Sequence, residues 1–361
     1  MIKKYKIIKG GMADVISNPL MGKMNDLNIK FKKDLNDVFN DETINNKKIP
    51  MPKLDNNKTI FSMNNKCGPV FGFVEGSCIP LSILQQIADE YNKNVNDNNK
   101  IKTLRDIEIK ENNLEDYKLY LVNELQIALG KNQKEWYENK LLKNLNSEIV
   151  DILKKSIFRP EGPDKQFEWM DSVRMKIVMK QYEDLYHKFK FLSCVPLDFE
   201  NFPSVYKLTN IDYEKLENEG KTRFGIIINS DRHTGGGQHW FMMFYDLEKG
   251  EIYFIDSCAN PPARYGKEID IFVNGIKNYL ISKGFKEDEI VYKYNKIQHQ
   301  YKNTECGVYS MYYILQFLKK KTFKEITENI LSDDDVNEYR LIFFSNMPKQ
   351  WKKSKKSIAD N

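Results

Sequence analysis

The sequence lacks several features that would place the protein in a specialised class. No apolar run has the length of a membrane span, and no early apolar segment has the character of a signal peptide. The net charge is only +5 against 56 basic and 51 acidic residues, so overall charge gives no argument for nucleic-acid binding. We therefore expect a soluble protein without a membrane span, made in the cytosol.

Cysteine and histidine are both scarce. Five cysteines, an odd number without close pairing, argue against a disulfide scaffold and for a reducing compartment. Cys67 and Cys78 lack the second Cys/His pair of a zinc site, so we expect core packing or a backbone contact there rather than a metal. Cys258 is expected to be a small buried residue. With only four histidines in the chain, chance placement of one in a catalytic pattern is uncommon.

Composition divides the chain into four stretches. Residues 1–65 form an arm of low order rich in Lys and Asn, and residues 66–160 carry helical patterns. The run Arg159-Pro-Glu-Gly-Pro163 breaks the pattern and precedes a chemistry-bearing domain at 161–345. Residues 346–361 form a basic tail.

Hydrophobic periodicity predicts the elements. The expected helices cover 80–91, 114–129, 147–157 with Ser147 as N-cap, 172–191, 269–283, 306–318 and 332–344. The expected strands cover 224–228, 240–245, 251–256 and 289–297. The second and third strands flank the turn Leu247-Glu-Lys-Gly250 and form a β-hairpin.

The hairpin predicts a meeting of His239 and Asp256. They lie nearly symmetrically about the turn, so antiparallel pairing brings them to neighbouring positions. A carboxylate bonded to one imidazole nitrogen fixes the tautomer and leaves the other nitrogen free to take a proton from a thiol.

Cys306 opens the apolar helix at 306–318 and is the candidate nucleophile. A thiol at a helix N-terminus feels the positive end of the helix dipole, which favours the thiolate. Gly307 lets the backbone approach closely where a larger side chain would obstruct the substrate, and the apolar helix should give the nucleophile a rigid support.

Gln300 is the candidate oxyanion donor. It lies six residues before Cys306, and its amide, with the Cys306 N–H, could bind the oxygen of a tetrahedral intermediate. Neighbouring Gln298 is its competitor. Trp240, next to His239, could wall the cleft and exclude water.

Each of these residues has an ordinary interpretation when taken alone. A histidine beside a strand and a buried cysteine are common, but His, Asp, Gln and Cys in this order form the parts of a cysteine hydrolase. His299 has no paired carboxylate and is expected to be an exposed loop histidine, while His187 and His233 are expected to be structural or solvated.

The order His-Trp, Asp-Ser, Gln, Glu-Cys-Gly resembles the Ulp1/adenain-type cysteine peptidases, which include SUMO-specific and adenoviral proteases. Trp169-Met170 resembles the Trp-Leu pair that shapes the substrate groove in that family. Three further runs resemble the polyprotein proteases of large DNA viruses related to African swine fever virus: Cys67-Gly-Pro, Ser77-Cys78-Ile-Pro and 191–199. Glu305 departs from the Asp found there in many relatives, a change expected to matter little.

The resemblance implies an α+β fold, in which a papain-like core packs a central mixed sheet on the nucleophile helix, preceded by a helical N-terminal region. It implies a cysteine endopeptidase that needs no metal or cofactor and cleaves viral structural polyproteins after Gly-Gly-type sites during virion maturation, in the host cytoplasm and the virion. The alternatives are an isopeptidase that removes SUMO or ubiquitin-like proteins, and an acetyltransferase or inactive binding module.

Both ends of the chain carry weaker predictions. The tail run Trp351-Lys-Lys-Ser-Lys-Lys356 offers cations and an aromatic ring for a weak nucleic-acid contact, although such tails are usually just solvated. Gly10-Gly11 in the arm is a site that a Gly-Gly-directed protease could cut in its own chain, although such pairs are ordinary in polar segments.

Overall fold

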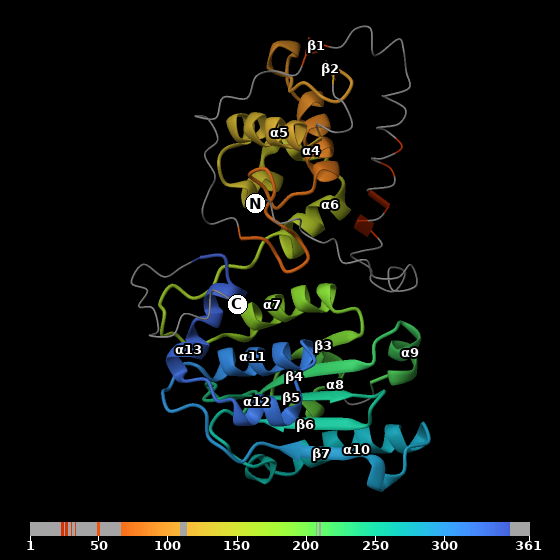
Figure 1. The fold of residues 1–361 in the computed structure, drawn as a ribbon, viewed down its shortest axis with the longest axis vertical. Helices are drawn as coiled ribbons and strands as arrows, with labels where there is room; N and C mark the ends of the chain where they lie inside the picture. Colours follow the sequence, from red (N-terminus) through yellow and green to blue (C-terminus); the bar gives the residue numbers. More distant parts are fainter. Residues whose placement is uncertain are drawn as a thin grey trace. The chain divides into compact units, whose positions relative to one another are not determined.

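The computed structural model of the chain describes residues 23–24, 26–27, 30, 33, 49–50, 66–108, 114–206, 208 and 211–346. The basic tail, Gly10-Gly11 and most of the predicted arm lie outside these residues, so the predictions made for them stay predictions. The chain forms two compact units, Met1–Arg159 and Pro160–Asn361 (Figure 1). No helix in the described part of the chain is long and apolar enough to cross a bilayer.

The first unit is helical and has its own hydrophobic core. Its elements are β1 (Ile49–Pro50), α4 (Leu81–Lys93), β2 (Ile107–Glu108), α5 (Leu114–Leu129) and α6 (Ser147–Ile152). The apolar stripe predicted on α4 is buried, with Ile83, Leu84 and Ile87 at 0% exposure. The N-cap of α6 is Asn146 rather than Ser147, because the Asn146 side chain accepts from the Glu148 N–H at 2.7 Å.

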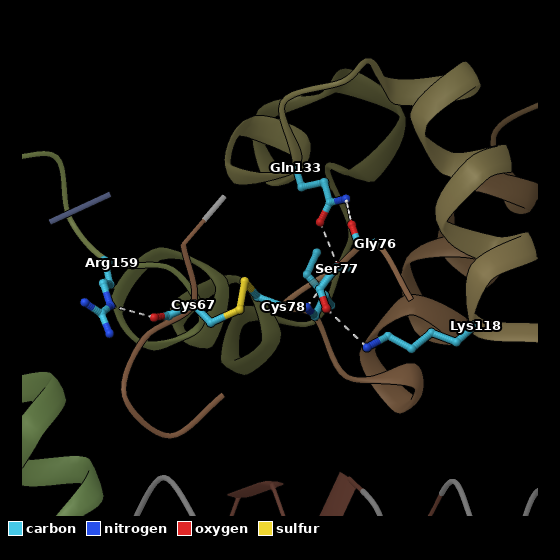
Figure 2. The surroundings of a disulfide bond; sticks show 8 residues. Cys67, Gly76, Ser77, Cys78, Lys118, Gln133 and Arg159 are labelled. Atoms are coloured by element: carbon cyan, nitrogen blue, oxygen red, sulfur yellow. Dashed lines mark hydrogen bonds between the residues drawn. A yellow bond between two sulfur atoms is a disulfide. The ribbon is translucent and has the colours of Figure 1, made fainter. Parts of the chain in front are cut away.

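A disulfide joins Cys67 to Cys78 in this unit, so the expectation of unpaired cysteines here was wrong (Figure 2). The chain doubles back at Glu75 and Gly76, both with positive φ, and the two Cα atoms come within 5.2 Å. That separation suits a disulfide. Sequence spacing gave no sign of the reversal.

Hydrogen bonds fix both ends of the disulfide segment. The Arg159 Nε donates to the Cys67 carbonyl at 2.8 Å (Figure 2). The Ser77 hydroxyl donates to the Gln133 side chain at 2.7 Å, and Lys118 Nζ donates to the Ser77 carbonyl at 3.3 Å. Burial lowers the pKa of Lys118 to about 8. The segment is therefore anchored to the rest of the unit by polar contacts as well as by the sulfur bond.

The second unit is built on a five-stranded mixed sheet in the order β3-β4-β5-β6-β7. The strands are β3 (Phe189–Pro196), β4 (Arg223–Asn229), β5 (Trp240–Asp246), β6 (Glu251–Ile255) and β7 (Val291–Tyr294). Strands β4, β5 and β6 are antiparallel, whereas β3 and β7 add parallel edges. The predicted hairpin and the predicted strand at 224–228 are confirmed.

Alternating side chains of the sheet enter two cores on opposite faces. One core contains Ile227, Met242 and Phe244 with residues of α7 (Ser172–Leu185) and α11 (Cys306–Leu318). The other contains Phe241, Met243 and Tyr245 with residues of α10 (Lys267–Ser282). The unit also contains α8 (Pro203–Tyr206), α9 (Tyr213–Asn218), α12 (Phe323–Glu328), α13 (Asp333–Asn337) and α14 (Tyr339–Phe343). The sheet is thus sandwiched between helices, and α11 lies on one face of it.

Two predicted helices were too long. The helix expected over 172–191 ends at Leu185, and Phe189 and Phe191 instead belong to β3, where both are buried in the period-two pattern of a strand. The helix expected over 332–344 is two short helices, α13 and α14, with Glu338 between them.

Candidate active site

The β5–β6 hairpin brings His239 and Asp256 to one end of the sheet. His239 directly precedes the first residue of β5, and Asp256 directly follows the last residue of β6. Because the pairing aligns Met242 with Ile255, the two side chains meet across the strands. His239 Nε2 lies 2.7 Å from Asp256 Oδ1. The hairpin prediction therefore gave the correct partner for His239.

Asp256 is fully buried and held by several donors. Besides His239, its Oδ1 accepts from the Cys258 N–H at 2.7 Å. Its Oδ2 accepts from Asn260 Nδ2 at 3.0 Å and from the Tyr265 hydroxyl. Burial by itself would raise the pKa of Asp256, but the hydrogen bond from His239 and these other donors lower it below its ordinary value. The carboxylate is ionised and fixed in orientation.

The same contacts control the charge of His239. Burial by itself would lower the pKa of the imidazole. Hydrogen bonds to Asp256 and to Cys306 outweigh burial and raise the pKa to about 9. Since Nε2 is occupied by Asp256, the other ring nitrogen, Nδ1, is the one available to the thiol.

Cys306 is the first residue of α11, and its thiol lies close enough to His239 to contribute to the raised pKa of the imidazole. The residue is 6% exposed, and every residue of α11 from Cys306 to Leu318 is buried. The prediction that this helix is buried is confirmed. A thiol beside an imidazole held by a carboxylate can transfer its proton and attack an electrophilic carbonyl carbon.

Gln300 lies in the loop after β7 and is tied to the end of β6. Its backbone N–H donates to the Ser257 carbonyl at 2.9 Å, and its Oε1 accepts from the Ser257 hydroxyl at 2.6 Å. Its Nε2 donates to the Lys302 carbonyl at 2.7 Å. An amide nitrogen has two hydrogens, so one remains for another acceptor. Gln298 has its own side-chain bond, to the Gln300 carbonyl at 2.6 Å.

The three residues predicted to line a substrate groove have different surroundings. Trp169 is 51% exposed, whereas Trp240 is half-buried and donates from Nε1 to the Met170 carbonyl at 3.0 Å. Gly307 faces the interior, because an added Cβ would lie 2.6 Å from Met170 Cβ. The requirement for glycine there thus comes from packing against Met170 rather than from room for a substrate.

His299 was wrongly expected to be exposed. It is 2% exposed, its Nε2 lies 3.1 Å from the Thr327 carbonyl, and its Nδ1 lies 2.8 Å from the Tyr313 hydroxyl. Burial lowers its pKa. Both ring nitrogens are used, so His299 is a structural residue. His233 pairs with Asp198 at 2.7 Å, and His187 lies in the turn after α7.

A buried polar cluster behind Cys306 was not predicted from the sequence. Glu305 has no exposed surface, and its carboxylate accepts from the Thr304 hydroxyl at 2.5 Å and from Asn337 Nδ2 at 3.1 Å. Arg340 donates to the carbonyls of Glu168 at 2.5 Å and Thr304 at 3.2 Å, and burial lowers its pKa to about 10. A charged residue directly before the candidate nucleophile was the available signal.

One group of three potential metal-ligating residues occurs in the described part of the chain. A ring nitrogen of His239, a carboxylate oxygen of Asp256 and the sulfur of Cys258 lie within 4.8 Å of one another. Cys258 is partly exposed rather than buried as expected, and burial together with the charge of Asp256 raises its pKa to about 11.

Comparisons with known proteins agree with this geometry. Residues 225–353 match the Ulp1 protease family, C-terminal catalytic domain. A putative thiol protease of Acanthamoeba polyphaga mimivirus is 31% identical over 300 residues, covering 81% of this chain and 97% of the relative. A cysteine protease of African swine fever virus is 26% identical over 204 residues, covering 52% of this chain and 71% of the relative.

A solved structure supports the fold. The crystal structure of the African swine fever virus protease aligns with a TM-score of 0.51 at 19% identity, covering 80% of this chain and 98% of that chain. The mixed sheet with its helices and the helical N-terminal region therefore follow a known architecture, as the predicted fold class required.

Proposed function

The chain belongs to the Ulp1 protease family and is a cysteine protease, and we propose that Cys306, His239 and Asp256 are its catalytic residues. One observation carries the proposal: a single imidazole is bonded to a buried carboxylate and lies close enough to the thiol at the start of α11 for that thiol to raise the imidazole pKa.

The reaction proceeds in two stages. His239 takes the thiol proton and the Cys306 sulfur attacks the scissile carbonyl carbon. When the C–N bond breaks, His239 returns the proton to the leaving amine, which leaves a thioester on Cys306. His239 then takes a proton from water, the hydroxyl attacks the thioester carbon, and the proton goes back to the sulfur. Asp256 holds the imidazole throughout and stabilises its charged form.

The oxyanion of each tetrahedral intermediate is stabilised by the Cys306 N–H and the Gln300 amide. The first N–H groups of a helix have no partner within the helix, so the Cys306 N–H points out of α11. The bonds of Gln300 to Ser257 and Lys302 support this role, because they fix the amide before substrate binds.

The substrates that we propose are viral structural polyproteins, cleaved after Gly-Gly-type sites in the host cytoplasm and the virion. The resemblance to proteases of large DNA viruses supports this choice, and so do the relatives from mimivirus and African swine fever virus. The rival substrate is an isopeptide-linked ubiquitin-like protein, since some relatives from African swine fever virus are named SUMO-1 cysteine proteases.

N-terminal profiling of infected-cell protein tests both substrates. The extract is incubated with the wild-type chain or with Cys306→Ala, and new N-termini are identified by mass spectrometry. We expect new N-termini after Gly-Gly in structural proteins with the wild type only. Release of intact ubiquitin-like proteins, together with formation of an adduct between Cys306 and a ubiquitin-like vinyl sulfone, would show that the chain is an isopeptidase rather than an endopeptidase. New N-termini in both samples would contradict the assignment of Cys306.

A further inference from the structure

Cys258 supplies a third ligating group beside the catalytic pair, and the reaction makes no use of its thiol. Its sulfur lies within 4.8 Å of a ring nitrogen of His239 and of an oxygen of Asp256. Its backbone N–H donates to Asp256 Oδ1 at 2.7 Å, which keeps the residue close to the carboxylate. Unlike Asp256, Cys258 is partly exposed, so an ion can reach the group from solvent.

The chemistry of the three groups selects a particular class of ion. Thiolate, imidazole and carboxylate together are typical ligands of Zn²⁺, whereas Mg²⁺ and Ca²⁺ prefer oxygen ligands alone. Ligand atoms on one tetrahedral zinc ion lie about 3–4 Å apart, given zinc–ligand bonds of about 2.0–2.3 Å. His239 Nε2 and Asp256 Oδ1 lie 2.7 Å apart, slightly closer than this, so the two groups must move a little apart while the Cys258 side chain adjusts toward them.

We propose that His239, Asp256 and Cys258 bind one zinc ion that inhibits the protease, with water as the fourth ligand. The inhibition, although not the binding, rests on the proposed catalytic role of His239. The ion takes the place of the proton between His239 Nε2 and Asp256 Oδ1. That proton and the thiol proton of Cys258 pass to solvent, and the Cys258 sulfur becomes a thiolate ligand.

Zinc at Nε2 would stop the proton transfers of His239. When the imidazolium loses its Nε2 proton to solvent and bonds the metal there, its other proton stays on Nδ1 and is held more tightly than in the imidazolium, so the ring can neither accept a proton from Cys306 nor donate one readily to the leaving amine. The Asp256 Oδ2 keeps its bonds to Asn260 and Tyr265, which hold the carboxylate in place as a ligand. The site is therefore supported on its buried side and open at the fourth position.

Zinc titration of the full-length chain tests the proposal, with Cys258→Ala as the test variant and Cys194→Ala as the matched control. Cys194 is also unpaired and lies on β3, away from the His239–Asp256 pair. Reductant is omitted so that the Cys67–Cys78 disulfide stays intact and adds no thiols. Binding is followed by calorimetry and peptide cleavage by fluorescence, with each variant normalised to its own rate in chelator.

We expect the wild type and Cys194→Ala to bind one zinc ion and to lose cleavage activity with the same zinc dependence. Cys258→Ala should raise both the dissociation constant and the inhibitory concentration at least about tenfold, because it removes a protein ligand. Magnesium should leave all three proteins active. In the wild type, zinc should also protect Cys258 from iodoacetamide, a measurement that requires no variant to fold.

Three outcomes would overturn the site: equal inhibition of Cys258→Ala and wild type, an equal loss of affinity in Cys194→Ala, or unprotected Cys258. The first would put the ion on Cys306 and His239 alone. Zinc binding that depends on Cys258 in a chain with no peptidase activity would leave the metal site standing and remove the proposed catalytic roles instead.

Discussion

His239 has two ring nitrogens with different tasks. Nε2 is committed to Asp256 at 2.7 Å, and this bond turns Nδ1 toward the thiol of Cys306. Asp256 in turn depends on Tyr265 and Asn260 for its own position. The proposed base, His239, is thus oriented by a chain of hydrogen bonds that begins at residues outside the proposed triad.

Substitution of the three proposed catalytic residues should have unequal effects. Cys306→Ala and His239→Ala should each abolish peptide cleavage, because each removes a group that takes part in bond breaking. Asp256→Asn should retain some activity, with kcat lowered by about 10²–10⁴, because the base survives in a poorer tautomer. Steady-state kinetics with a peptide substrate measures all three. Cleavage by Cys306→Ala above a few per cent of the wild-type rate would exclude this nucleophile.

The alkaline limit of activity should follow His239. The protonated imidazole donates the proton to the leaving amine, and the pKa of His239 is raised to about 9, so activity should persist above pH 6.5 and fall as the pH rises through about 9. In Asp256→Asn the alkaline fall in activity should occur at lower pH, because the hydrogen bond to Asp256 that raises the pKa of His239 is weakened or lost. The pH profile of kcat/KM measures both. If activity falls at the same alkaline pH in both proteins, Asp256 does not set the pKa that limits activity.

Gln300→Ala tests the oxyanion donor. The amide contacts the oxygen mainly in the transition state, so kcat should fall by about 10²–10³ with little change in KM. Gln298→Ala is the matched control and should have a smaller effect on kcat. A change confined to KM in Gln300→Ala would assign Gln300 to substrate binding, and a larger loss of kcat in Gln298→Ala would make Gln298 the donor.

At the scale of elements, the start of α11 is fitted closely to the segment before α7. Gly307 leaves no room for a Cβ next to Met170 and Met175, and the Met170 carbonyl accepts from Trp240 Nε1. Arg340 holds the same region, because it bonds the carbonyls of Glu168 and Thr304. The proposed nucleophile, Cys306, is therefore positioned by contacts on more than one side of its helix.

Gly307→Ala should destabilise the second unit by about 1–3 kcal/mol, because the added methyl group overpacks the contact with Met170. Gly275→Ala is the matched control. Gly275 lies within α10 with open space where a Cβ would be, so this change should be neutral or stabilise by about 0.5–1 kcal/mol. Hydrogen exchange of peptides from α11 and α10 measures the change in stability of each variant. An equal change in stability in the two variants would show that packing against Met170 does not require glycine at position 307.

At the scale of the whole molecule, the chain has two units with separate cores, and the disulfide lies entirely in the first. All of the proposed catalytic residues lie in the second. The disulfide differs from the unpaired cysteines that the cysteine count favoured, and the reducing compartment stays a prediction.

Removing the disulfide should loosen the first unit. The bond spans a sequence separation of 11 residues, so a Cys67→Ala/Cys78→Ala variant should destabilise that unit by about 2–3 kcal/mol. Hydrogen exchange of peptides from α4 and α5 measures the loss, with peptides from the second unit as the internal reference. A reducing agent should reproduce the effect in the wild type and leave the variant unchanged. Identical exchange in all samples would show that the bond contributes no stability.

Features that depend on neighbours along the chain could be predicted from the amino-acid sequence. The β5–β6 hairpin follows from two apolar strands around a short turn, so the pairing of His239 with Asp256 could be predicted from register alone. The bounds of α11 and the burial of its side chains followed from an apolar run that opens at Cys306. Such patterns predict which face of an element is buried, because the period of the backbone is fixed.

Contacts between segments far apart in the chain could not be predicted from the sequence and are known only from the tertiary structure. The pairing of Cys67 with Cys78, the burial of His299 under Thr327 and Tyr313, and the contacts of Arg340 with Glu168 and Thr304 carry no local pattern. A polar side chain is buried where the fold supplies a hydrogen-bond partner, and that partner is chosen by packing rather than by spacing. For this reason the sequence predicted the residues that meet within one hairpin, while their support at Tyr265, Asn260 and Glu305 became visible only in the folded chain.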